Sequence, residues 1–159
     1  MKQILKKAPI LFLISFSLMG CTSKEVKLLK KIEDSGFVKH LTDAKILFSY
    51  EHITGFDSSG PVYYVLDFTD KEKDFLDQFN NKKTGENSLL NGPSDKFEEL
   101  VNDFVQQWIG MAYLEFKEEY QIDFEKPYSY YCASLERTID YAIIYRSDTS
   151  IANLLYLQS

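Results

Sequence analysis

Cysteine and histidine are scarce in this chain of 159 residues, which contains two of each. So few thiols cannot build the disulfide framework of a small secreted scaffold. The spacings of these residues also match no zinc finger, zinc knuckle or HExxH helix. The sequence therefore predicts no transition-metal site.

The familiar catalytic and nucleotide-binding motifs are also missing. The chain has no GxSxG elbow, no P-loop and no GxGxxG fingerprint. No spacing makes one pair among its 24 acids stand out as a glycosidase pair. One dense acidic stretch lacks the glycine and the ligand order of an EF-hand loop, so a solvated helix face is favoured over calcium. It consists of Asp67, Asp70, Glu72, Asp74 and Asp77. We expect no catalytic residue, no metal and no cofactor, and hence a protein that is not an enzyme.

An excess of basic residues is lacking too. The chain has 18 Lys and Arg against 24 Asp and Glu, a formal net charge of −6. Binding to nucleic acid requires a basic footprint that neutralises phosphates. The composition therefore argues against a nucleic-acid partner.

The N-terminus carries the most informative motif. An apolar run over residues 8–19 follows Lys2, Lys6 and Lys7, and it is shorter than the roughly 20 apolar residues that a membrane span needs. Its end, Leu18-Met19-Gly20-Cys21, resembles the lipobox of bacterial lipoproteins. This resemblance covers residues 1–22 and implies a diacylglyceryl group on the Cys21 thiol, cleavage before Cys21 and acylation of the new N-terminus, for example with palmitate. No family suggests itself for the rest of the chain.

The resemblance implies a division of the chain and a location. Residues 1–20 would be a cleaved signal peptide, and residues 21–159 a single lipid-anchored globular domain. The protein would be membrane-anchored on the extracytoplasmic side through its N-terminal lipid. Because Thr22 and Ser23 follow the cysteine in place of the aspartate that resembles a retention signal, the outer membrane is favoured in a Gram-negative host. In a Gram-positive host the anchor would be in the cell membrane.

Removal of the leader changes the net charge, and lipidation of Cys21 changes the number of free thiols. The leader holds three lysines and no acid, so the net charge falls from −6 to −9. The basic end is the tethered end, because residues 21–45 carry +2 and residues 46–159 carry −11. The lysines that follow Cys21 either lie against anionic headgroups or form a solvated helix face. With Cys21 lipidated, Cys132 has no disulfide partner and is either a nucleophile beside His40 or His52 or, as we favour, a small buried hydrophobe.

Hydrophobic periodicity predicts eight elements. Helical spacing indicates a helix over residues 24–34, and alternation around a Gly and Ser turn indicates a hairpin of strands over 46–53 and 61–68. A capping-box spacing of Thr69 and Glu72 predicts a helix to about Asn80, followed by a loop over residues 80–93. Ser94 is the expected N-cap of a helix from Asp95 to about Glu119. Three further strands are predicted over residues 128–134, 139–146 and 151–158.

The order α-β-β-α-α-β-β-β predicts an α+β fold. We expect a single antiparallel sheet of about five strands with the helices packed on one face. Both faces of the strands are apolar, however, so the second face needs cover from the chain itself or from a partner. The long helix has an apolar sector wider than usual, and Gly110 lies inside it, where it can permit a bend.

Three alternative functions are compatible with the sequence. The first is a non-enzymatic protein-binding domain of the cell envelope, which engages an envelope or secreted protein through its acidic surface or a tyrosine-bearing sheet face. An immunity-like or inhibitor-like role is one example of this function. The second is a structural or assembly lipoprotein that docks through the wide apolar helix. The third is a small-ligand binder with a pocket near Trp108.

Overall fold

The computed structural model describes residues 23–36, 38–52, 60–80, 89–135 and 138–158. The predicted signal peptide, Cys21, the hairpin turn and most of the loop before Pro93 lie outside these ranges. Helix α2 (Lys24–Asp34) comes first, with Ser23 as its N-cap, and is followed by strands β1 (Lys45–Glu51) and β2 (Gly60–Asp67). These three elements agree with the expected helix and hairpin.

The second half of the chain also follows the predicted order, with additions. Helix α3 (Glu72–Asn80) precedes a two-residue strand β3 (Leu90–Asn91), and Ser94 caps helix α4 (Asp95–Phe104). The three C-terminal strands are β4 (Ser129–Leu135), β5 (Thr138–Arg146) and β6 (Ile151–Gln158). The capping box predicted for α3 is wrong: the Thr69 hydroxyl donates to Asp67, and Glu72 accepts a hydrogen bond from the Tyr145 hydroxyl.

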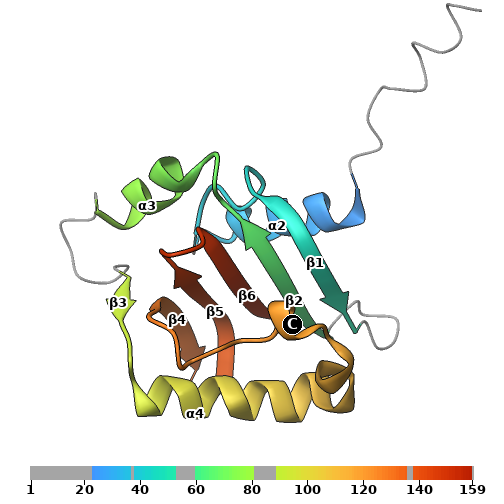
Figure 1. Ribbon diagram of the computed structural model, residues 1–159. Helices are drawn as coiled ribbons and strands as arrows, with labels where there is room; N and C mark the ends of the chain where they lie inside the picture. Colours follow the sequence, from blue (N-terminus) through green and yellow to red (C-terminus); the bar gives the residue numbers. More distant parts are fainter. Residues whose placement is uncertain (1–22, 37, 53–59, 81–88, 136–137, 159) are drawn as a thin grey trace, which may run out of the picture.

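The six strands of the described residues form one antiparallel sheet in the order β1-β2-β6-β5-β4-β3. The C-terminal strand β6 therefore lies in the interior of the sheet, between β2 and β5. The α+β class and the single antiparallel sheet are confirmed, and β3 raises the strand number from about five to six. Figure 1 shows the sheet with helices on both sides.

The expectation that the helices pack on one face is corrected by the two apolar clusters. Alternate residues of β2 point to opposite faces, as the period of a strand requires: Val62, Tyr64 and Leu66 pack with α2 and α3, whereas Tyr63 and Val65 pack with α4. We call these covers the α2/α3 layer and the α4 layer. The apolar second face is thus buried by the chain itself.

The long predicted helix is shorter than expected. Helix α4 ends at Phe104, a π-helical turn η2 (Val105–Ile109) follows, and the helical path breaks at Gly110, with φ 60° and ψ −136°. Beyond it lie two 3-10 turns, η3 (Gly110–Glu115) and η4 (Glu118–Tyr120). The second apolar sector belongs to this redirected chain: Tyr113, Phe116 and Tyr120 return to the sheet and pack around Tyr63 and Phe48.

Candidate binding site

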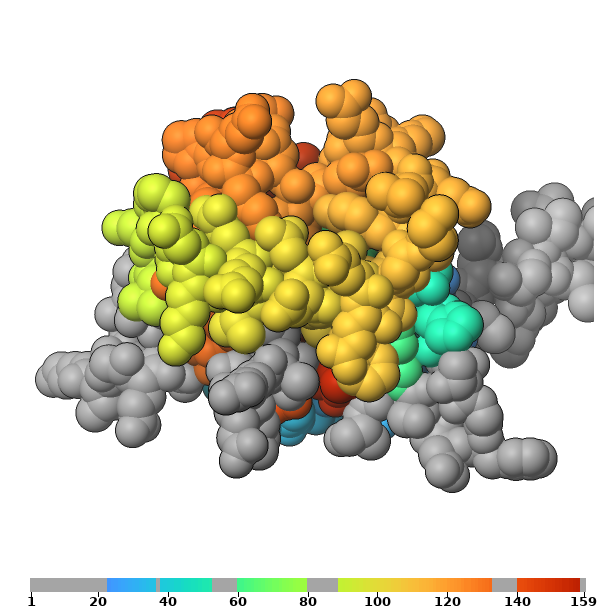
Figure 2. Space-filling model, turned by 90° about the horizontal axis from the view of Figure 1, so that it is seen from below, coloured from blue at the N-terminus to red at the C-terminus, as the bar shows by residue number. Residues whose placement is uncertain are grey.

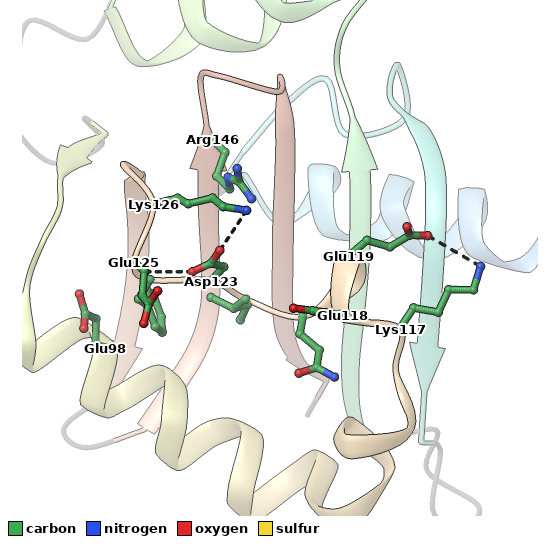
Figure 3. Close-up of a pocket in the computed structure, with 11 residues that line it drawn as sticks. Glu98, Lys117, Glu118, Glu119, Asp123, Glu125, Lys126 and Arg146 are labelled. Atoms are coloured by element: carbon green, nitrogen blue, oxygen red, sulfur yellow. Dashed lines mark hydrogen bonds and ion pairs between the residues drawn. The ribbon is translucent and has the colours of Figure 1, made fainter.

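A cavity of about 760 Å³ lies beside the segment that follows η3. This segment runs back across the sheet on the side of the α4 layer and reaches β4 (Figure 3). We call the cavity the polar basin. Its lining consists of Glu98, Lys117, Glu118, Glu119, Gln121, Ile122, Asp123, Phe124, Glu125, Lys126 and Arg146.

The buried Tyr63 and the half-buried Tyr113 hold the wall of the basin on the sheet. The Tyr63 hydroxyl donates to the carbonyl of Tyr120 and accepts a hydrogen bond of 2.8 Å from Nδ2 of Asn153. The Tyr113 hydroxyl accepts one of 2.6 Å from the N–H of Ile122. Burial raises the pKa of both tyrosines, so the hydroxyls stay protonated. Irregular backbone over an apolar face needs such partners for its polar groups.

The other wall depends on Tyr128, which joins three segments. Its hydroxyl donates to Oε1 of Glu98 at 2.6 Å and accepts from the N–H of Ser94 at 3.1 Å. Burial and the Glu98 carboxylate raise the pKa of Tyr128 to about 12. Gly92 lies so close that a Cβ there would come within 2.4 Å of the ring. The start of α4 is thereby fixed beside the chain that enters β4.

The charges of the basin are unequal. Five carboxylates face three cations, and two of the cations are paired inside the basin: Lys126 lies 3.1 Å from Asp123 and Lys117 lies 3.7 Å from Glu119. Hydrogen bonding to Lys126 lowers the pKa of Asp123. The exposed Glu118 and Glu125 form no ion pair with any residue that the structure describes. They can therefore accept hydrogen bonds from a basic ligand without first breaking an ion pair.

Arg146 closes one end of the basin from the end of β5. One of its terminal nitrogens lies 2.9 Å from Asp148, while its Nε is buried and makes no hydrogen bond within the described residues. Figure 3 shows its guanidinium beside the Lys126 ammonium and above Asp123. The two cations and the carboxylates of Asp123 and Asp148 balance one another. The net negative charge thus comes from the glutamates.

An apolar pair lies next to the basin in the chain. Met111 and Leu114 are 77% and 70% exposed, and both belong to η3. Residues three apart in a 3-10 helix lie on the same side. Figure 2 shows α4 in yellow and the following segment in orange covering this side of the molecule. The surface of the α4 layer therefore combines an exposed apolar pair with acidic side chains.

The candidate site residues from the sequence analysis have different neighbours and do not form a common site in the described part of the chain. Cys21 lies outside the described residues. Cys132 packs in the cluster under the α4 layer, where burial and Asp140 raise the pKa of its thiol to about 11, so little thiolate forms near neutral pH. His40 lies 2.8 Å from Asp43, and the His52 ring stacks on Tyr50. These contacts place neither histidine beside the thiol.

Two of the acids weighed for calcium form local contacts. Asp67 accepts hydrogen bonds from Thr69, and Asp77 pairs with Lys73. Across the described ranges, no group of three or more His, Cys, Asp or Glu residues has a geometry that could hold a metal ion. Trp108 is half-buried against the apolar cluster and does not line the basin.

Sequence reasoning missed the basin because it assigned its residues to different elements. Glu98 lies on α4 and Arg146 on β5, and the order of the sheet brings them to one cavity. The available signal was the acidic stretch from Glu115 to Glu125, part of which was placed in the long helix.

Comparisons with protein-family models, with curated proteins and with solved structures give no match for this chain. Among the described residues, no helix has the length and apolar character that a membrane crossing requires.

Proposed function

We propose that this chain is a lipid-anchored, non-enzymatic binding domain of the bacterial cell envelope that engages a basic segment of another envelope or secreted protein. The polar basin is the observation on which this proposal depends. Glu118 and Glu125 are exposed and form no ion pair with any described residue, and the exposed apolar pair Met111 and Leu114 precedes this segment in the chain. Protein interfaces combine an apolar centre with a polar rim in this way.

Charge supports a basic partner. Residues 46–159, which form the sheet, α3, α4 and the basin, carry a net charge of −11. A surface of one sign raises the rate at which an oppositely charged protein is encountered. An immunity-like or inhibitor-like role, in which a tethered acidic domain intercepts a basic toxin, is consistent with this chemistry.

The test is site-specific photocrosslinking of the full-length protein in its own envelope. A photoreactive residue in place of Glu118 would report contacts at the basin, and one in place of Lys73 on α3 would report contacts on the opposite layer. We expect one dominant product from position 118 that is absent from position 73 and from a Cys21→Ser chain. Equal products at both positions, or none at position 118, would contradict the proposal.

Charge-reversal variants then show whether the partner binds through the basin or through the apolar pair. Glu118→Lys with Glu125→Lys should weaken the crosslinked complex and reduce its dependence on salt, since both carboxylates are exposed rim groups. Met111→Ala with Leu114→Ala is the matched pair of variants on η3. If only the alanine pair abolishes the complex, the second candidate is favoured, an assembly lipoprotein that docks through its exposed apolar residues.

A further inference from the structure

The outward face of α2 is basic, and it begins three residues after the proposed lipidated cysteine. Lys24, Lys27, Lys30 and Lys31 are all exposed, whereas Asp34 is the exposed acid of this helix. At 3.6 residues per turn, Lys24, Lys27 and Lys31 lie along one stripe. The opposite face of the helix buries Leu29 and Ile32.

The acids around this stripe leave its outer surface positive. The carboxylates of Glu51 and Glu33 pair with Lys24 at 2.7 Å and with Lys30 at 3.3 Å, but their side chains are only 10% and 9% exposed. Lys27 and Lys31 form no ion pair with any residue that the structure describes. Asp34, at the end of the helix, is 66% exposed and pairs with Lys30 at 3.3 Å. With four lysines against Glu25, Glu33 and Asp34, α2 keeps a net charge of +1.

Helix α2 is firmly joined to the domain from its first turn. The Ser23 hydroxyl caps it by accepting a hydrogen bond from the N–H of Val26, and the Lys24 ion pair ties its start to the end of β1. Three peptide units span at most about 11 Å. A lipid on Cys21 would thus hold the start of α2 within about this distance of the headgroups.

We propose that α2 lies flat on an anionic phospholipid surface, with Lys24, Lys27 and Lys31 against the headgroups. This inference rests on the proposed lipid anchor. It sets the orientation of the domain: α2 and α4 cover opposite faces of the sheet (Figure 1), so the polar basin opens away from the membrane.

Lysine footprinting of the full-length lipidated protein tests this orientation. The protein would be reconstituted in vesicles of phosphatidylcholine alone or mixed with anionic phosphatidylglycerol, and treated with a membrane-impermeant acylating reagent. We expect acylation of Lys27 and Lys31 to be about fivefold slower in anionic vesicles, the factor for about 1 kcal/mol per headgroup-bound lysine. Lys96, which is exposed on α4, is the internal control and should react equally in both.

Two further measurements distinguish the outcomes: the salt dependence of the protection and the mass of the N-terminal peptide. Protection by headgroup charge should disappear at high salt, where the screening length falls to about 3 Å at 1 M. Equal rates at Lys27, Lys31 and Lys96 in anionic vesicles, on a protein whose N-terminal peptide carries lipid on Cys21, would overturn the orientation and leave the anchor intact. An N-terminal peptide without lipid on Cys21 would overturn the anchor and, with it, this inference.

Discussion

At the scale of single residues, the tyrosine hydroxyls join parts of the chain that are far apart in sequence. Tyr63 connects the centre of β2 to Asn153 on β6 and to the backbone of Tyr120. Asn153 is 5% exposed and is the buried polar residue of the described core. The Tyr63 hydroxyl therefore provides a hydrogen-bond partner both for the amide of Asn153 in the core and for the carbonyl of Tyr120 in the wall of the basin.

Tyr63→Phe should therefore destabilise the domain although it keeps the ring. The buried Asn153 amide and the Tyr120 carbonyl each lose a partner, and an unsatisfied buried group costs about 1–3 kcal/mol. Tyr130→Phe is the matched control, because the Tyr130 ring stacks on Phe97 while its hydroxyl makes no hydrogen bond in the described part of the chain. Urea denaturation of the two variants checks this, and equal midpoints would refute the role of the Tyr63 hydroxyl.

At the scale of elements, the strands were predictable and the irregular segments were not. Alternating or continuous apolar runs bounded by turn residues identified β1, β2, β4, β5 and β6, since a strand buried on one face alternates and a strand buried on both faces is apolar throughout. The helical spacing of apolar residues continued through Gly110, so the change in chain direction at this glycine was missed. The basin was also missed, because the sheet order decides which elements meet there. β6 lies between β2 and β5, and the periodicity of a strand does not reveal its neighbours in the sheet.

At Gly110 the chain leaves the direction of α4 and turns toward the segment that forms the wall of the basin. Its φ of 60° and ψ of −136° fall in a region that side chains disfavour, while a Cβ there would meet no atom within 4 Å. Gly110→Ala should thus cost about 1–3 kcal/mol through the backbone alone. Thermal unfolding measures this cost, with Met111→Ala, at an exposed neighbour, as the control that should leave the melting temperature unchanged. A Gly110→Ala domain as stable as the control would mean that the break does not depend on glycine.

At the scale of the whole molecule, tyrosines are buried on both faces of the sheet, and we therefore expect the stability of the domain to fall at alkaline pH. Burial raises the pKa of seven tyrosines, namely Tyr63, Tyr64, Tyr113, Tyr128, Tyr131, Tyr141 and Tyr145. An unfolded tyrosine loses its proton near pH 10. The folded state therefore holds more protons than the unfolded state above that pH.

The sign of this linkage predicts alkaline unfolding. Because the folded pKa values exceed the unfolded value, the contribution of these tyrosines to stability is complete below about pH 10 and falls as the pH rises through the folded values, about 12 for Tyr128. Tyrosinate absorbance and circular dichroism should then change together in one cooperative step above pH 10, since the buried hydroxyls ionise when the sheet opens. Gradual ionisation of these tyrosines with the circular dichroism unchanged would show that both layers admit hydroxide without unfolding, which is incompatible with a sheet sealed on both faces.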